Sequence, residues 1–184
     1  ISIRHGGEVS AVLLDRRAVT AGLDGSVRIW ELPAPELLPR VRSKENDIPF
    51  SVELDPTGST LATTHADGGV RIWDLRSGKS RQEGSSGILA FFSPDGKRIA
   101  VLDDRHLRIG DLKPIDLGGT AASGAFAPDG ARLAVGFDDG RVAIWDALSG
   151  AEQKIAMRLD GSVDALAFSP DGSHLAGAHE GGTA

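Results

Sequence analysis

The sequence contains no cysteine and no tyrosine, and only one methionine and three tryptophans occur among its 184 residues. The absence of cysteine excludes disulfide scaffolds, thiolate catalysis and cysteine-ligated zinc. The longest wholly apolar run, Ile88 to Phe92, is far too short to span a bilayer, so no membrane partner is expected. A formal net charge of −6 leaves no broad basic field for phosphate backbones, which argues against nucleic acid as a partner.

Glycine, by contrast, is abundant at 24 residues, and proline occurs 9 times. This composition predicts many tight turns between short apolar strands. No apolar period of 3.6 residues separates those strands, so helices are not expected. The chain starts at Ile1 with neither an initiator methionine nor a secretory signal, which predicts a piece of a longer protein.

Two series of residues repeat along the chain. Turns that read Pro-Asp-Gly, or close to it, recur at intervals of 34 to 42 residues, with their prolines at Pro56, Pro94, Pro128 and Pro170. The second series marks the end of a strand at Trp30, Trp73, Gly110 and Trp145. An aspartate stands six residues before each of these four sites: Asp24, Asp67, Asp104 and Asp139. The constant offset of six indicates one structural unit repeated four times.

The fourth repeat shows how each unit divides into strands. Ser123 to Ala127 is the first predicted strand, Arg132 to Gly136 is the second, and Val142 to Trp145 is the third. A Pro-Asp-Gly turn joins the first two, because proline presets its own φ and glycine supplies a positive φ. The second strands are almost continuously apolar or small, which predicts sheets that are covered on both faces.

These motifs resemble the repeats of the WD-repeat β-propeller family, in the style rich in Ser-Pro-Asp-Gly that bacterial members share. The resemblance implies an all-β fold of four-stranded antiparallel blades, with a ring that is incomplete or is completed by further sequence or another chain. The whole chain, 1–184, would be one propeller segment. Its repeats are about 5–42, 43–84, 85–118, 119–160 and a partial repeat at 161–184, and strand 1–4 belongs to a closing blade. The predicted outer strands are 36–42, 79–82, 114–117 and 152–156.

In this family a histidine, a serine or threonine, an aspartate and a tryptophan form a hydrogen-bonded tetrad in each repeat. The resemblance implies a complete tetrad in the first repeat, with Trp30 almost fully buried: His5, Thr20, Asp24 and Trp30. Partial tetrads would remain at Thr63, Asp67 and Trp73, at Asp104, and at Asp139 and Trp145. The residues that depart from the pattern are Glu45, Ala100, Gly110 and Val135.

Neither a catalytic nor a metal constellation stands out in the sequence. The five histidines show no zinc-ligand spacing, and each Asp-Gly turn offers too few oxygens for calcium. No Gly-x-Ser-x-Gly elbow and no phosphate loop followed by lysine occur. We therefore expect no enzyme activity, no metal and no cofactor.

An acidic rim is the candidate partner-binding surface. In an antiparallel meander, the turns between second and third strands share a rim with the loops that lead into the first strands. The candidate rim residues are His65, Leu102, Asp103, Phe137, Asp138 and Glu180. Phe137 either packs against the next blade or anchors a partner, since buried aromatic side chains carry much of the energy of protein interfaces.

We therefore expect a non-catalytic scaffold that binds a protein or peptide, with the acidic rim favouring a basic one. By analogy it would be part of a larger, bacterial-type signalling or docking protein in the cytoplasm. One alternative is a self-assembling propeller fragment, natural or engineered, whose ring is completed as a homo-oligomer. Another is the propeller domain of a hydrolase or translocation protein, because Ser93 to Val101 also resembles the repeats of those proteins.

Overall fold

The computed structural model describes residues 9–14, 17–22, 26–31, 41–42, 48–84 and 86–179. The chain divides into two compact units, Ile1–Ala90 and Phe91–Ala184. Among the described residues the elements are all strands, which confirms the all-β prediction, and no helix there is long and apolar enough to cross a bilayer. Several predicted features lie outside the described residues: strand 1–4, most of outer strand 36–42, His5, Asp24, Glu45 and Glu180.

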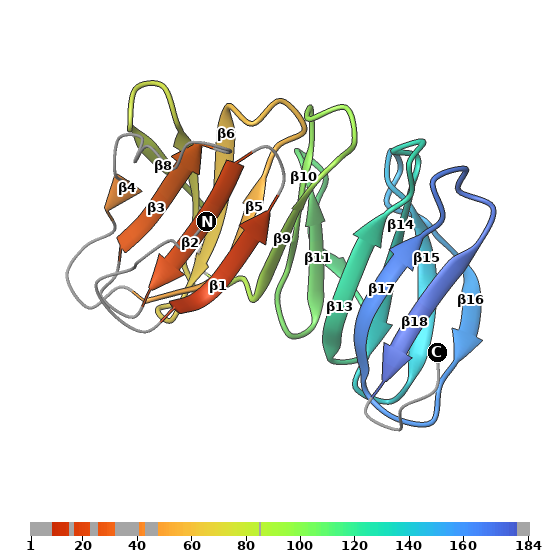
Figure 1. Ribbon diagram of the computed structural model, residues 1–184. Helices are drawn as coiled ribbons and strands as arrows, with labels where there is room; N and C mark the ends of the chain where they lie inside the picture. Colours follow the sequence, from red (N-terminus) through yellow and green to blue (C-terminus); the bar gives the residue numbers. More distant parts are fainter. Residues whose placement is uncertain are drawn as a thin grey trace. The chain divides into compact units, whose positions relative to one another are not determined.

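Unit one contains two four-stranded antiparallel sheets (Figure 1). The first sheet has the order β1-β2-β3-β4, with β1 Val9–Leu14, β2 Arg17–Gly22, β3 Ser26–Glu31 and β4 Val41–Arg42. The second has the order β5-β6-β7-β8, with β5 Pro49–Leu54, β6 Thr60–His65, β7 Val70–Asp74 and β8 Ser80–Gly84. Each strand pairs with its neighbours in the chain, so both sheets are meanders, as the blades of a propeller are.

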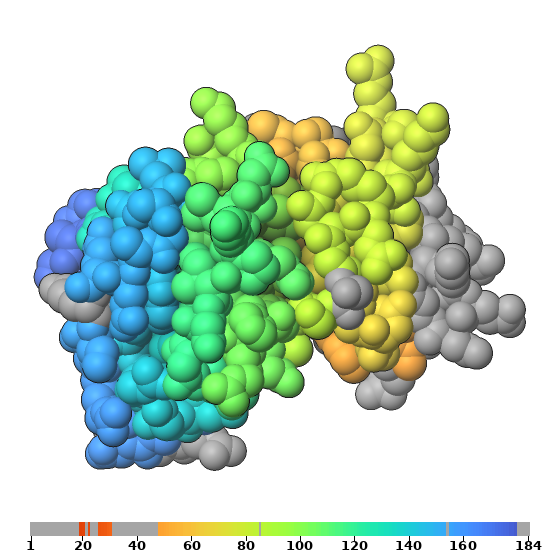
Figure 2. All heavy atoms as spheres, turned by 180° about the vertical axis from the view of Figure 1, so that it is seen from behind, coloured from red at the N-terminus to blue at the C-terminus, as the bar shows by residue number. Residues whose placement is uncertain are grey.

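The next sheet begins in the last two residues of unit one and continues in unit two. It comprises β9 Leu89–Phe92, β10 Ile99–Leu102, β11 His106–Ile109 and β12 Ile115–Asp116. The fourth sheet comprises β13 Ala121–Phe126, β14 Arg132–Phe137, β15 Arg141–Asp146 and β16 Glu152–Arg158. A two-stranded sheet follows, β17 Val163–Phe168 with β18 Leu175–His179. The outermost strand β16 is exposed along much of its length, as the blue surface in Figure 2 shows.

The Pro-Asp-Gly turns adopt the backbone that their sequence predicts. In each turn the glycine N–H donates to the carbonyl three residues earlier, at 2.8 to 2.9 Å. The four glycines have φ between 67° and 69°: Gly58, Gly96, Gly130 and Gly172. A side chain at this φ would clash with its own backbone, so the turn favours glycine. These turns therefore fix where the first strand of each sheet ends and the second begins.

The core lies between stacked sheets. In unit one, β2 and β3 pack against β5, β6 and β7 through a cluster of Val19, Val27, Ile29, Val52, Leu61 and Trp73. In unit two, every residue of β10 is buried, and so is β14 from Leu133 to Phe137. Strands that are buried on both faces explain why their sequences are continuously apolar rather than alternating.

Candidate functional site

In unit two the acidic rim is built where a turn meets two loops. The backbone N–H of Asp138, in the turn between β14 and β15, donates to the Thr120 carbonyl at 3.1 Å, in the loop before β13. The Ser162 hydroxyl donates to the Asp138 carboxylate at 3.3 Å, and the Leu159 N–H donates to the Gly140 carbonyl at 2.9 Å. These hydrogen bonds hold the turn beside the loop that leads into β17.

Exposed carboxylates gather on this part of the rim. Asp138, Asp139 and Asp160 are all exposed. Asp139 pairs with Arg141, Oδ2 to Nε at 2.7 Å, and this hydrogen bond lowers the pKa of Asp139 below its usual value. Among the described residues, neither Asp138 nor Asp160 has an ion-pair partner. The rim therefore carries negative charge that a cationic partner could neutralise.

The three less polar residues of the candidate rim are buried, so they contribute no surface to a partner. His65 and Phe137 are each 1% exposed, and Leu102 is fully buried. These residues end β6, β10 and β14, where their side chains point into the interior instead of outward. The Arg141 guanidinium carbon lies 4.3 Å from the centroid of the Phe137 ring, and the centroids of the Phe137 and Trp145 rings are 6.1 Å apart. Phe137 therefore packs within the fold and presents no anchor to a partner.

In the third sheet a different aspartate from the expected one forms the turn. The carboxylate of Asp103 accepts the backbone N–H groups of Arg105 at 2.9 Å and His106 at 2.6 Å, and its side chain is mostly buried. Asp104, which keeps the six-residue offset, is exposed. The turn between β10 and β11 is one residue shorter than its counterparts, which moves the bonding position to Asp103.

Exposed apolar side chains occur on the rim of unit one, and the sequence analysis missed them. Phe50 is 59% exposed and Ile88 is 38% exposed. The Ser51 and Thr64 hydroxyls bond each other at 2.9 Å, and Thr64 donates to the Ile88 carbonyl at 3.1 Å. This chain of bonds links the start of β5 to the residue just before β9. Phe50 lies where the pairing register shifts between Pro49 and Ser51, a β-bulge that turns its side chain outward.

The first-repeat tetrad is described only in part. The Trp30 indole N–H donates to the Thr20 hydroxyl at 3.2 Å, as the resemblance implies. Trp30 is half-buried rather than almost fully buried, so the predicted depth is wrong. In the fourth repeat Trp145 is buried, but Val135 beside it has no hydroxyl to accept the indole N–H.

In the second repeat a histidine from the strand itself joins the polar network. The Trp73 indole N–H donates to the Thr63 hydroxyl at 2.8 Å, and Thr63 also bonds His65 Nε2 at 2.6 Å. His65 therefore provides an imidazole to Thr63 although Glu45 stands at the loop position of the family's histidine. The signal was present in the sequence, because residues two apart in a strand face the same side.

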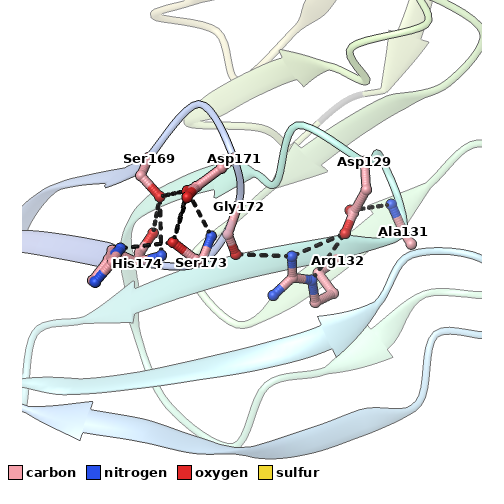
Figure 3. A network of polar contacts seen from close by, with 8 residues as sticks. All are labelled: Asp129, Ala131, Arg132, Ser169, Asp171, Gly172, Ser173 and His174. Carbon is pink, nitrogen blue, oxygen red and sulfur yellow. Dashed lines mark hydrogen bonds and ion pairs between the residues drawn. The ribbon is translucent and has the colours of Figure 1, made fainter.

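One group of residues has the composition of a nucleophilic triad but not its geometry (Figure 3). Ser173 Oγ lies 2.7 Å from His174 Nδ1 and 2.7 Å from Asp171 Oδ1. In a working triad the carboxylate orients the histidine, and the histidine takes the serine proton. Here the serine hydroxyl donates to Asp171 instead. Hydrogen bonds from the Ser169 hydroxyl foremost, and from Ser173, lower the pKa of Asp171 to about 2.

The remaining unusual titratable group is Glu53 on β5. Burial raises the pKa of Glu53 to about 7. A raised pKa suits a general acid, but it does not identify one without a reacting group within hydrogen-bond reach. The described residues also contain no group of three histidine, aspartate or glutamate side chains that could hold a metal ion.

Comparison with known proteins identifies the repeats. The WD domain, G-beta repeat family matches residues 40–74, 120–146 and 153–184, which together make up just over half of the chain. The Protein LST8 homolog of Drosophila melanogaster is 24% identical over 89% of this chain, and Autophagy-related protein 16 of Arabidopsis thaliana is 27% identical over 91% of it. The chain spans 56% of the first relative and 36% of the second.

Two further comparisons bear on fold and function. Tricorn protease homolog 1 of Streptomyces coelicolor is 46% identical over 57 residues, which cover 31% of this chain and 5% of that protein. The crystal structure of the Cps50 (Swd1) β-propeller domain of Myceliophteria thermophila superposes with a TM-score of 0.76 at 20% identity, over 96% of this chain and 64% of that one. The repeated turns, the meandering four-stranded sheets and the family match agree: this chain belongs to the WD-repeat family and has the fold of its β-propellers.

Proposed function

We propose that this protein is a non-catalytic scaffold that binds a basic protein or peptide through its acidic rim. WD-repeat propeller domains are typical of protein-interaction scaffolds, which supports the general class. The observation that carries the specific proposal is the grouping of Asp138, Asp139 and Asp160 on loops that are hydrogen-bonded to one another. Such a group of like charges attracts an oppositely charged partner and favours its encounter.

Phe50 and Ile88 are separate candidate contact residues, in unit one. Large apolar side chains at this level of exposure lose water favourably when a partner covers them. Aromatic side chains are also frequent among the residues that dominate binding energy. We therefore propose Phe50 as an apolar anchor for a partner that binds unit one.

Neutralising one carboxylate of the rim is expected to weaken binding about two- to fivefold, in keeping with the modest energies of exposed charge pairs. The test uses the tightest peptide recovered from a displayed random library, labelled with a fluorophore, and measures its polarisation. Asp138→Asn and Asp160→Asn should each weaken binding, and the loss should shrink as salt is added.

Asp111→Asn is the matched control for this measurement. Asp111 is exposed and lies in the turn between β11 and β12, which the meander places at the opposite rim. Its substitution removes the same charge and should leave the affinity unchanged. Equal affinities for all three variants and the wild type would contradict the proposed binding surface.

The proposal includes a place in a larger bacterial-type signalling or docking protein of the cytoplasm. The style of the Pro-Asp-Gly repeats and the local identity to a Streptomyces coelicolor protein support the bacterial part. That protein is a tricorn protease homolog, so the match also supports the alternative of a propeller domain attached to a hydrolase. We favour the scaffold, because the match covers a small part of that protein.

Self-association is a second candidate, favoured by one face of the β17-β18 sheet. In the preceding sheet Ala134 is fully buried, and a Cβ on Gly136 would lie 2.5 Å from Val163 Cγ1. Ala176 and Ala178 occupy the equivalent places in β18, and both are exposed. The first strand of another blade, from a second copy or a longer chain, would cover them. Sedimentation velocity tests the second copy: dimers that increase with concentration support it, and a 19.2 kDa monomer at every concentration contradicts it.

A further inference from the structure

An arginine follows two of the four Pro-Asp-Gly turns at the same place. Arg98 and Arg132 both stand four residues after the turn proline, at Pro94 and Pro128. Arg98 directly precedes β10, and Arg132 is the first residue of β14. Both guanidinium groups therefore lie where one turn ends and a buried strand begins, at the rim opposite the acidic rim.

Arg98 binds two backbone carbonyls of the following sheet. Its Nη1 donates to the Ala147 carbonyl at 2.9 Å, and its Nη2 donates to the Gly130 carbonyl at 2.9 Å. Gly130 belongs to the next Pro-Asp-Gly turn, and Ala147 follows β15. The planar guanidinium holds two donors in a fixed geometry, so two such bonds define position as well as attraction.

Arg132 makes the corresponding contact one sheet further along the chain, and Figure 3 shows its partners Asp129 and Gly172. Its Nη2 donates to the Gly172 carbonyl, in the turn between β17 and β18, at 3.0 Å. Asp129 of its own turn accepts from Arg132 Nε at 3.2 Å and from Nη2 at 2.9 Å. The guanidinium carbon also lies 5.5 Å from the centroid of the Phe168 ring. Asp129 thus orients the Arg132 side chain, and the Arg132 guanidinium binds the Gly172 carbonyl of the next sheet.

The acceptor glycines fit closely against the proline and arginine of the preceding turn. A Cβ on Gly172 would lie 2.9 Å from Arg132 Nη2 and 3.6 Å from Pro128 Cδ. A Cβ on Gly130 would lie 3.5 Å from Arg98 Nη2 and 3.6 Å from Pro94 Cδ. The positive φ of the glycine allows its own turn to form. Its lack of a side chain leaves room for the proline and arginine of the preceding turn.

We infer that the sequence Pro-Asp-Gly-x-Arg is a clamp between consecutive blades, in which the arginine of one turn binds the glycine carbonyl of the next turn. The arrangement recurs with acceptors 32 and 40 residues away, so it follows the repeat and not a local accident of the chain. Thr60 and His174 occupy the arginine position in the other two copies and have no guanidinium. The clamp is therefore present in two of the four copies and absent from the other two.

Hydrogen exchange tests the clamp at the acceptor turn. Within that turn, the Gly172 N–H donates to the Ser169 carbonyl at 2.8 Å, and the His174 N–H donates to the Ser169 hydroxyl at 2.9 Å. Neither bond involves Arg132, so their exchange rates report only how firmly the turn is held. In the full chain, Arg132→Ala is expected to speed exchange of these two amides roughly tenfold, as the loss of a hydrogen bond to a charged group implies.

Arg98→Ala is the matched variant for the preceding junction. It should speed exchange of the Gly130 amide, which donates to the Ala127 carbonyl at 2.8 Å, more than that of Gly172. The clamp is overturned if Arg132→Ala affects only its own turn, residues 127–132, and leaves residues 169–174 at the wild-type rate. If Arg132→Ala does not fold, Arg132→Lys is the substitute, because it keeps the positive charge but lacks the planar guanidinium with its fixed donors. An intermediate increase at residues 169–174 in that variant supports the clamp, and wild-type rates there overturn it.

Discussion

Replacement of Trp73 with alanine is expected to lower the free energy of unfolding by about 3–5 kcal/mol, the range for large aromatic truncations in cores. Trp73 is 4% exposed and packs in the cluster between the two sheets of unit one. Its indole N–H also donates to the Thr63 hydroxyl, which bonds His65 in turn. The substitution would remove the packing and leave this buried polar pair without its third member. Urea unfolding followed by far-UV circular dichroism measures the change.

Trp30→Ala is the control for this experiment, because Trp30 occupies the same place in the first repeat. Trp30 also donates to a threonine, but over 3.2 Å, and it is only half-buried. Because folding removes less apolar area from water at Trp30 than at Trp73, replacing Trp30 should lower the free energy of unfolding clearly less. If both variants lost the same free energy of unfolding, the burial of the tryptophan would not determine how much it stabilises the protein.

Gly140→Ala is expected to cost roughly 3 kcal/mol, from a strained φ together with a steric clash. Gly140 has φ of +83°, and a Cβ there would lie 2.1 Å from the Leu159 carbonyl oxygen. That oxygen belongs to the backbone, and the Leu159 N–H is itself hydrogen-bonded to the Gly140 carbonyl. The acidic rim would therefore have to open for the methyl group to fit. Thermal melting of the purified variant measures the loss.

Gly78→Ala separates the two contributions to that loss. Gly78 has φ of +70°, yet nothing lies within 4 Å of the place where its Cβ would be. Only the backbone strain remains, so the expected cost is about 1 kcal/mol. If Gly78→Ala and Gly140→Ala melted at the same temperature, the close approach of the Leu159 carbonyl would not be a source of destabilisation.

The strands and turns of this protein could be predicted from its sequence because local chemistry determines them. A glycine such as Gly130 is needed at φ of +67°, and the proline two residues before it presets its own φ. Runs such as Leu133 to Phe137 are apolar on both faces, which requires stacked sheets. Because these signals recur in the same order in every repeat, one repeat supports the interpretation of the next.

The details of the site could not be predicted, because contacts between different strands determine them. Phe137 and Phe50 both stand near strand ends, but the first is covered by Arg141 and the second projects from a β-bulge. The order of residues in one strand does not show which side chains of the paired strand cover it, or where the pairing register shifts. The same holds for Arg132, whose acceptor lies 40 residues further along the chain.

The central claim is that the acidic rim, and not the rim of the Pro-Asp-Gly turns, receives the partner. Nuclear magnetic resonance of the ¹⁵N-labelled protein, titrated with the peptide selected from the random library, tests it most directly. We predict that amide shifts gather at Asp138, Asp139 and Asp160 and that the signals of the opposite turns stay in place. Shifts confined to the turns around Gly130 and Gly172 would contradict it.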